Sequence, residues 1–499
     1  MDISPSRDDF HALAADHSVV PVWRELLADL ITPVAAFARL CGDDQPGFLF
    51  ESVEHGERWS RFSFVGRNPI ATLVLRDGIV TVDGELPAAM PRGQGILAAI
   101  EWLLAAYRSP SLDALPPLHG GVVGYLGYDV VREVEDLAET PHDATGYPDA
   151  VMAVIGQLAA FDHFRQRVTL IDNVLVPEGA TAADLDRLYD QAALRLEQLA
   201  ADGASPLAEP MVDPPSPSPD LPEVTGSMTY SQWESAVEVA KERILDGDIF
   251  QVVLSQRFSF ELGADPFDFY RVLRQVNPSP YMYFVRMPEL SLAGSSPEPM
   301  VKLVDNRVIS RPIAGTRRRG ATEEEDRRLG AELREHPKEI AEHVMLIDLA
   351  RNDVGRVVEF GTEQVDEMMI LERYSHVMHL TSQVSGELRE GLGPIDVLRA
   401  TLPAGTVSGA PKVRAMQIID SLEPVRRGPY AGIVGYVDFN GNFDAAIAIR
   451  TMFAQGNSAW FQAGAGVVAD SDPDDENLEC HNKAAAMVAA LPTARRMTA

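Results

Sequence analysis

Residues 338–353 of the chain read KEIAEHVMLIDLARND. The apolar positions favour a helix over residues 339–351, in which Glu339 and Glu342 stand three residues apart and share one face. Most single pairs with this spacing lie on a solvated helix face, so the pair alone indicates little. The significance of the segment depends on what else the chain carries.

A second pair with the same spacing, Glu476 and Glu479, lies in DPDDENLECHNK at residues 472–483. Two such pairs brought together offer the hard oxygen ligands that Mg²⁺ prefers, with positions left for water and a carboxylate of a small molecule. The sequence therefore predicts that residues 339–342 and 476–479 form one magnesium site.

Helix and strand patterns alternate on both sides of residues 338–353. Ser231 and Glu234 have the spacing of a capping box, so a helix is expected to begin there and to stop at Gly247. The mixture, with several glycine-rich strand ends, predicts an α+β fold with large sheets. Strands are predicted at 70–75, 78–82, 250–260, 281–286, 432–439 and 445–453, and helices at 97–107, 182–199, 322–334 and 339–351.

Residues 202–224 are rich in Pro, Ser and Asp and have no apolar periodicity, which is typical of an exposed linker. A chain of 499 residues is too long for one compact core. We therefore expect an N-terminal lobe at 1–201, the linker at 202–224 and a second domain at 225–499.

The composition excludes several classes of protein. A formal net charge of −31 argues against nucleic-acid binding, and no apolar run is long enough to span a membrane. The two cysteines, Cys41 and Cys480, support neither a disulfide framework nor a zinc site. The N-terminus lacks the features of an export signal, so a cytoplasmic location is expected.

Several glycine-rich segments accompany the acidic pairs. Glycines and small hydroxyl residues at strand ends let backbone N–H groups approach an anion closely. Neither a GxGxxG nor a P-loop occurs, so nucleotide binding has no support. The segments are RPIAGT at 311–316, TVSGAPK at 406–412, YAG at 430–432 and AGAG at 463–466.

From about Thr229 to Met487, these motifs in this order resemble the chorismate-utilising enzymes, among them the anthranilate, aminodeoxychorismate, isochorismate and salicylate synthases. The resemblance implies large antiparallel β-sheets packed as a sandwich with helices on the outside. It also implies one Mg²⁺ that holds the ring carboxylate of chorismate.

The resemblance also implies roles for single residues. Glu342 and Glu479 match the glutamates that ligate Mg²⁺ directly, and Glu339 and Glu476 match their partners. Glu298, in the segment SPE at 296–298, matches the acid that protonates the departing C4 hydroxyl. The other catalytic matches are His379 and Thr406, and the substrate-binding matches are Gly315, Thr316, Tyr430, Arg450, Gly464, Gly466 and Lys483.

Charge and acidity are consistent with these roles. Chorismate carries two carboxylates, so a chain of charge −31 must supply local positive charge from Mg²⁺, Arg450 and Lys483. Hydroxide is a poor leaving group near neutral pH. A glutamate can protonate it only if burial or neighbouring carboxylates raise its pKa.

Two positions favour one member of the family. Isochorismate and salicylate synthases activate water with a lysine where this chain has Gln251, whereas ammonia needs no base. Aminodeoxychorismate synthases carry PIKGT where this chain has PIAGT, with Ala314 in place of the lysine. The sequence thus resembles most the large subunits of anthranilate synthases, which add ammonia at C2 of chorismate and eliminate pyruvate.

The N-terminal part supports this choice. Residues 48–52, FLFES, resemble a segment of the tryptophan inhibitor site, and NPSPYM at 277–282 resembles the segment that completes it. Glu51 is expected to bind the ammonium group of L-tryptophan. The expected inhibitor site consists of Glu51, Ser52, Pro280, Tyr281 and Met282.

Neither cysteine lies in a segment that resembles a glutamine amidotransferase, and glutamine-derived ammonia requires a nucleophilic cysteine. A separate glutamine amidotransferase subunit is therefore the expected partner. Two alternatives remain open: component I of aminodeoxychorismate synthase, and a non-catalytic relative that only senses tryptophan.

Overall fold

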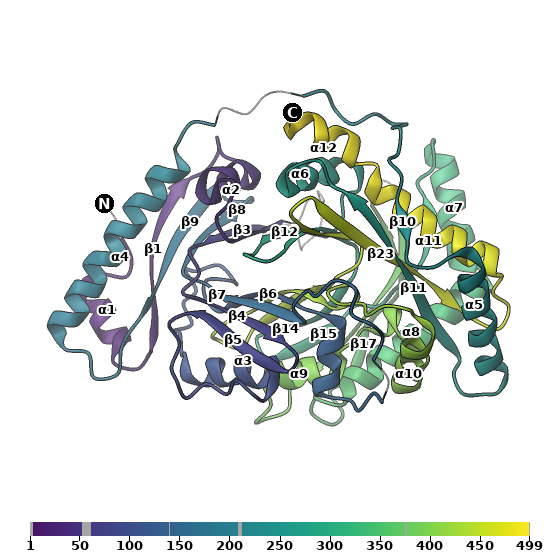
Figure 1. Ribbon diagram of the computed structural model, residues 1–499. Helices are drawn as coiled ribbons and strands as arrows, with labels where there is room; N and C mark the ends of the chain where they lie inside the picture. The colour runs from purple at the N-terminus through teal and green to yellow at the C-terminus, as the bar shows by residue number, and fades with distance from the viewer. Residues whose placement is uncertain (1–2, 52–60, 139, 208–211, 375–376, 499) are drawn as a thin grey trace.

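The computed structural model describes residues 3–51, 61–138, 140–207, 212–374 and 377–498. Two large antiparallel sheets lie face to face, with helices on their outer sides (Figure 1). The prediction of an α+β fold with large antiparallel sheets and outer helices is confirmed.

The first sheet has 12 strands within the described residues. Their order is β1-β9-β8-β3-β2-β12-β13-β22-β23-β11-β10, and β19 pairs with β11 away from this path. The strands are β1 (Val19–Leu27), β2 (Gly47–Glu51), β3 (Phe62–Arg67), β8 (Gln157–Asp162), β9 (Arg167–Leu175), β10 (Thr225–Gly226), β11 (Gln251–Glu261), β12 (Tyr281–Arg286), β13 (Ser291–Ser296), β19 (Gly409–Ala410), β22 (Thr451–Gln455) and β23 (Ser458–Val467).

The second sheet has 11 strands in the described part of the chain. Their order is β16-β18-β15-β14-β21-β20-β6-β7-β4-β5, and β17 pairs with β18. The strands are β4 (Ala71–Arg76), β5 (Ile79–Gly84), β6 (Val122–Leu126), β7 (Ala150–Val154), β14 (Pro299–Val304), β15 (Arg307–Ser310), β16 (Ile313–Arg318), β17 (Gln364–Arg373), β18 (Val377–Glu387), β20 (Ile433–Val437) and β21 (Phe443–Ile447).

The helices cover the outer faces of the sheets. In Figure 1, α2, α6 and α12 lie above the first sheet, and α3 and α9 lie below the second. The helices are α1 (Arg7–Ala14), α2 (Pro33–Cys41), α3 (Gly95–Ala106), α4 (Ala182–Gly203), α5 (Tyr230–Leu245), α6 (Pro266–Val276), α7 (Glu323–Glu335), α8 (Pro337–Gly355), α9 (Pro394–Thr401), α10 (Lys412–Leu422), α11 (Pro473–Val488) and α12 (Leu491–Thr498), with 3-10 turns η1 (Tyr128–Glu133) and η2 (Gly405–Val407).

Strand β12 shows how the sequence builds two cores at once. Successive side chains of a strand point to opposite faces. Met282 and Phe284 join the cluster beneath the helices, whereas Tyr283 and Val285 join the cluster that includes residues of both sheets. Both faces of the strand are therefore buried, which explains its continuous apolar run.

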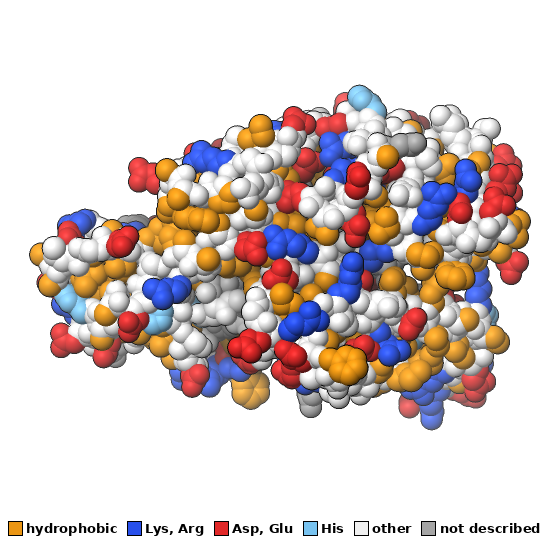
Figure 2. Space-filling model, turned by 90° about the horizontal axis from the view of Figure 1, so that it is seen from below, with side chains coloured by type: hydrophobic (Ala, Val, Ile, Leu, Met, Phe, Trp, Pro, Cys, Tyr) orange, Lys and Arg blue, Asp and Glu red, His pale blue; other side chains and the backbone are white. Residues whose placement is uncertain are grey.

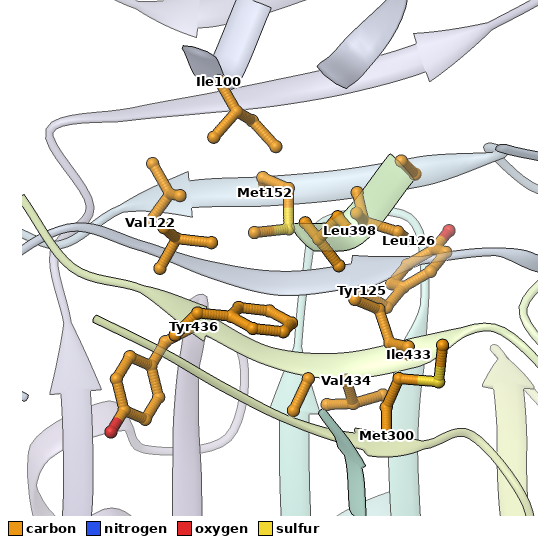
Figure 3. Close-up of a cluster of buried hydrophobic side chains, with 14 of the residues drawn as sticks. Ile100, Val122, Tyr125, Leu126, Met152, Met300, Leu398, Ile433, Val434 and Tyr436 are labelled. Carbon is orange, nitrogen blue, oxygen red and sulfur yellow. The ribbon is translucent and has the colours of Figure 1, made fainter. Parts of the chain in front are cut away.

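The second of these clusters extends through the 11-stranded sheet to its helices. Ile100 of α3 and Leu398 of α9 lie beside Met152 of β7 (Figure 3). All three side chains are at most 3% exposed. The cluster fixes the sheet on which the site described below is built.

Each sheet contains strands from both sides of the Pro-rich segment. Strand β2 pairs with β12 in the first sheet, and β6 pairs with β20 in the second. Between α4 and β10 the described residues contain no helix or strand. The division into segments 1–201, 202–224 and 225–499 stays a prediction.

The structure differs from two predictions. Helix α5 has its capping box at Thr229 and Gln232, where the Thr229 hydroxyl accepts from the Gln232 N–H. The helix therefore begins two residues earlier than predicted. The strand predicted at 445–453 is two strands, β21 and β22, one in each sheet. Arg450 separates them with φ +48°, and a left-handed residue is not visible as a break in apolar periodicity.

No helix in the described ranges is long and apolar enough to cross a membrane. On the face in Figure 2, acidic and basic side chains are interspersed. That face offers no continuous basic surface for a polyanion.

Candidate active site

The candidate site lies where the chain passes from one sheet to the other. Glu298 stands between β13 of the first sheet and β14 of the second, and Arg450 stands between β21 and β22. The two crossings are joined, because the Ile447 N–H donates to the Glu298 carbonyl at 3.0 Å and the Ser295 N–H donates to the Arg450 carbonyl at 3.1 Å. An acid and a cation from distant parts of the chain are thus held side by side.

Burial raises the pKa of the Glu298 carboxyl. The Thr406 hydroxyl, Arg450 and Lys483 oppose this rise, since each favours the ionised form. The Thr406 hydroxyl is itself buried and has no well-aligned hydrogen-bond partner in the described part of the chain. A small cavity of about 50 Å³ is lined by both side chains.

Arg450 supplies a cation at the same point. Its guanidinium forms no ion pair or hydrogen bond with any residue in the described ranges. Burial lowers its pKa, and the neighbouring Glu298 partly restores it. Its left-handed backbone costs about 1–2 kcal/mol for a residue with a Cβ. A strained backbone and a guanidinium without a direct partner are together typical of a functional position.

A second group of predicted substrate contacts lies across β11 and β23. The Lys483 ammonium donates to the Gly464 carbonyl at 2.7 Å and pairs with Glu479 at 2.7 Å. A Cβ at Gly464 would lie 3.1 Å from the Tyr430 hydroxyl, and one at Gly466 would lie 2.5 Å from the Gln251 amide nitrogen. The glycines therefore let these side chains lie directly against the strand.

Gly315, Thr316 and His379 form a third group. Gly315, with φ +65°, is the extra residue where the pairing of β16 and β18 shifts register, and Thr316 then stands opposite His379. The His379 Nδ1 lies 3.1 Å from the Gly315 carbonyl and 3.0 Å from the Thr316 hydroxyl. Because a carbonyl only accepts, we assign the proton to Nδ1, which leaves Nε2 as the acceptor. Burial lowers the pKa of His379 and favours this neutral form.

The two glutamate pairs are close enough for their charges to interact. Burial and then the carboxylate of Glu339 raise the pKa of Glu342, with further contributions from Glu479 and Glu476. Burial also raises the pKa of Glu476. Helices α8 and α11, distant in sequence, therefore place four carboxylates in one electrostatic cluster.

The carboxylates suit Mg²⁺ by chemistry, although two of them hold cations of the chain itself. The Arg317 guanidinium donates to Glu339 at 2.9 Å, and Lys483 pairs with Glu479. Among the described residues, no three acidic, histidine or cysteine side chains converge as they would on a bound metal. Sequence reasoning missed Arg317, although it directly follows the PIAGT motif.

A larger cavity, of about 340 Å³, lies between the sheets. Glu51 of β2 stands opposite Met282 of β12, so the two segments assigned to an inhibitor become neighbouring strands. Pro280, Tyr281 and Met282 line the cavity with Glu51. Ser52, the remaining residue of that prediction, lies outside the described residues.

Glu51 differs from the expectation in one respect. Its carboxylate accepts from the Tyr270 hydroxyl at 2.7 Å and from the Arg274 guanidinium at 2.9 Å, and the Arg274 Nε lies 2.7 Å away in the same ion pair. These bonds join β2 to α6. They engage both carboxylate oxygens, so an ammonium group would compete with Arg274 for Glu51.

The two cavities share part of a wall. Pro297 and Pro299 line the larger cavity, and Pro299 and Glu298 line the smaller one. Arg311 and Ile313 line both. The segment that carries the acid is therefore accessible from both cavities.

Comparison with known proteins agrees with this geometry. The family model described as chorismate binding enzyme matches residues 57–489. The chain belongs to the chorismate-binding enzymes. The resemblance found in the sequence is confirmed, and the expectation of a chorismate-utilising enzyme with it.

Members of this family cover nearly the full length. The chain is 45% identical over 495 residues to anthranilate synthase component 1 of Mycolicibacterium smegmatis, covering 98% of this chain and 94% of the relative. It is 42% identical to the protein of the same name from Acetivibrio thermocellus, covering 98% and 99%.

Solved structures of the family share the fold. Anthranilate synthase component I from Streptococcus pneumoniae has a TM-score of 0.75 at 36% identity, covering 93% of this chain and 99% of that one. The menaquinone-specific isochorismate synthase of Escherichia coli has a TM-score of 0.69 at 18% identity, covering 97% and 98%, and supports the fold alone.

Proposed function

We propose that this chorismate-binding enzyme forms anthranilate, by adding ammonia at C2 of chorismate with loss of the C4 hydroxyl and then eliminating pyruvate. The reaction would commit chorismate to tryptophan biosynthesis in the cytoplasm. The observation that carries the proposal is an acid with a raised pKa, Glu298, beside the Arg450 guanidinium, which forms no hydrogen bond or ion pair with the described residues.

The acid suits the departure of the C4 hydroxyl. Since burial raises the pKa of Glu298, the carboxyl keeps its proton at a pH where an exposed glutamate has lost it. Delivery of that proton as the C–O bond breaks turns hydroxide into water. Proton transfer by a positioned acid typically contributes about 10²–10⁴-fold to the rate.

The cations suit the two carboxylates of chorismate. Arg450 can pair with one carboxylate in a buried setting, where a charge-assisted hydrogen bond is strong. Tyr430 and Thr406 contribute hydroxyls, and Gly464 and Gly466 leave room for the anion. The neutral His379 would present Nε2 towards the reacting ring.

One side chain favours ammonia over water as nucleophile, and another favours its direct addition at C2. Gln251, which lies against Gly466, has an amide that cannot act as a base. Ammonia is already nucleophilic and needs none. Ala314 leaves no amine to compete for C2, which opposes the aminodeoxychorismate alternative.

The four glutamates Glu339, Glu342, Glu476 and Glu479 would hold Mg²⁺. When bound, the ion supplies positive charge that orients and neutralises the ring carboxylate. For the ion to bind, the ion pairs Arg317–Glu339 and Lys483–Glu479 would have to break. Breaking the second pair would leave Lys483 available for substrate.

The larger cavity suits feedback inhibition by L-tryptophan. Its volume lies within the usual range of small-molecule sites, and Tyr281 and Phe50, which pack on the inter-sheet side, offer an aromatic wall for an indole. We further propose that ammonia is supplied in the cell by a separate glutamine amidotransferase subunit. The name component 1, carried by the relatives, supports a second component.

The test is direct. The purified chain with chorismate, Mg²⁺ and an ammonium salt at raised pH should develop anthranilate fluorescence and release pyruvate in equal amounts. Chorismate consumption without pyruvate release would instead indicate the aminodeoxychorismate reaction. Tryptophan binding without any chorismate consumption would indicate a non-catalytic sensor.

A further inference from the structure

A fully buried ion pair lies behind the substrate contacts and touches none of the predicted catalytic groups. Glu423 and Arg427, both from the end of α10 and the turn that follows, have side chains only 2% exposed. Two hydrogen bonds of 2.6 and 2.9 Å join guanidinium and carboxylate. Burying such a pair is costly, and replacing it by apolar side chains often stabilises a protein. A stability role alone is therefore a weak explanation.

The remaining bonds of Arg427 reach two backbone segments of the site. Its guanidinium donates to the Val407 carbonyl at 2.6 Å, directly after Thr406, and to the Val253 carbonyl at 2.8 Å. Val253 stands opposite Gly466 in the pairing of β11 and β23. The planar guanidinium of Arg427 thus fixes the spacing between the 3-10 turn η2, which contains Thr406, and the strands β11 and β23, which hold Gly466.

Glu423 extends the same arrangement to the other glycine. Its carboxylate accepts from the Ser255 N–H at 2.9 Å and from the Ser255 hydroxyl at 2.8 Å. Ser255 stands opposite Gly464. The Gln462 amide in turn donates to the Ser255 hydroxyl at 2.8 Å, so the hydroxyl is bonded on both sides.

Aromatic contacts complete the arrangement. The Arg427 guanidinium lies 5.8 Å from the ring of Tyr430 and 4.7 Å from the ring of Tyr128, which belongs to the N-terminal part of the chain. The Tyr430 N–H also donates to the Arg427 carbonyl at 3.2 Å. Tyr430 is therefore held by both the side chain and the backbone of Arg427.

We infer that the Glu423–Arg427 pair positions the chorismate-carboxylate subsite formed by Thr406, Tyr430, Gly464 and Gly466. Both are positioning residues, because each acts through a neighbour and neither faces the cavity around Glu298. The inference rests on the proposed substrate. It goes further by assigning the geometry of the subsite to a pair outside the motif residues.

The experiment measures chorismate binding by calorimetry in the presence of Mg²⁺, using the full chain. Arg427→Met should raise the Kd for chorismate about tenfold or more, since lost contacts of this kind each cost about one order of magnitude. Arg427→Lys should be impaired similarly, because an ammonium cannot present a planar fork to two carbonyls. The number of binding sites per folded chain should stay unchanged.

The double variant Glu423→Gln/Arg427→Met removes both buried charges and guards against a simple loss of folding. It should unfold near the wild-type temperature and still bind chorismate at least about tenfold more weakly. Arg195→Met is the matched control, since its 2.7 Å pair with the buried Asp172 lies on α4 and β9. The control should keep the wild-type Kd.

The outcomes separate the two claims. A purely structural pair would lower the fraction of competent protein and leave Kd unchanged, which would overturn the inference. Full recovery of Kd in Arg427→Lys would also overturn it. Absence of anthranilate formation by a wild type that binds chorismate would contradict the proposed function, while the Kd comparison would still decide the inference.

Discussion

Glu298 is the residue on which the proposed chemistry depends most. Glu298→Gln keeps the shape of the side chain but removes the proton, so kcat should fall by at least about 10²-fold while chorismate binding changes little. The control is Glu324→Gln, on the exposed face of α7. Steady-state assays of anthranilate formation with ammonia give both values, and a kcat within a fewfold of wild type would exclude Glu298 as the acid.

The raised pKa of Glu298 also predicts a pH dependence. The acid must be protonated, so kcat at a fixed concentration of free NH₃ should fall as pH rises through the raised pKa. Stability follows the same direction. A carboxyl whose folded pKa exceeds its unfolded pKa contributes stability below the unfolded value and loses it as pH rises through the folded value. The fall in kcat should be absent in Glu298→Gln.

The glutamate cluster predicts opposite effects with and without metal. Because burial and then the neighbouring carboxylates raise the pKa of Glu342, the ionised side chain destabilises the metal-free chain at neutral pH. Glu342→Gln should therefore raise the unfolding temperature without Mg²⁺. The same change should abolish the stabilisation by added Mg²⁺ and reduce activity by at least about 10²-fold.

Thermal unfolding with Mg²⁺ and with EDTA measures these effects, alongside Glu324→Gln. Full activity in excess EDTA would contradict the magnesium proposal. Stabilisation of Glu342→Gln by Mg²⁺ equal to that of wild type would place the metal elsewhere.

At this scale much could be predicted from the sequence. The spacing within each of the pairs Glu339–Glu342 and Glu476–Glu479 predicted the cluster of carboxylates. The glycine-rich motifs pointed to Gly315, Gly464 and Gly466. Arg317 and Arg427 could not be found in this way. Their importance lies in contacts with distant segments, and a single arginine in an arginine-rich chain has no distinguishing pattern.

At the scale of elements, the pairing of β2 with β12 creates the larger cavity. Phe50 of β2 lines it, so Phe50→Ala should enlarge the cavity and remove an aromatic contact for an indole. Tryptophan should then inhibit about tenfold more weakly, because an aromatic pair contributes about 0.5–1.5 kcal/mol beyond the area that it buries, and about 1.4 kcal/mol is a factor of ten. Catalysis with ammonia should be unaffected.

Inhibition curves for wild type, Phe50→Ala and Phe164→Ala provide the comparison. Phe164 is 86% exposed, so its removal should change nothing. Ser52→Phe, which changes a residue of the expected inhibitor site, should abolish inhibition. Unchanged sensitivity of Phe50→Ala would move the inhibitor away from this cavity.

Elements were predictable except where the chain changes sheets. The strand at 281–286 matches β12 because its apolar run is uninterrupted. The region 445–453 is apolar on both sides of Arg450 and Thr451, yet it turns at Arg450 and enters the other sheet. Hydrophobic periodicity reports burial and cannot report which of two sheets a buried strand joins.

At the scale of the whole molecule, the two parts of the chain fold as one body. A fragment of residues 225–499 would leave β12 without β2 and β20 without β6, exposing long strand edges. The fragment alone should aggregate or be inactive, whereas co-expression with residues 1–203 should restore activity. Size-exclusion chromatography and the ammonia assay provide the measurement, and an active isolated fragment would contradict the prediction.

The nitrogen source is also a property of the whole chain. The described thiols Cys41 and Cys480 are buried, and burial raises the pKa of each to about 12, so neither suits nucleophilic attack. The purified chain should therefore use ammonium salts and not glutamine, with a rate that follows free NH₃. Glutamine-dependent turnover by the chain alone would reveal a glutaminase that the sequence does not suggest.

The proline-flanked segment around Glu298 has a consequence for measurement. A molecule bound in the larger cavity would contact Pro297 and Pro299, and chorismate in the proposed site would contact Glu298 between them. If each ligand prefers a different conformation of residues 297–299, each must weaken the binding of the other by the same factor. Saturating chorismate would then raise the Kd for tryptophan by a certain factor. Saturating tryptophan would raise the Kd for chorismate by the same factor. Two titrations on one sample would have to agree.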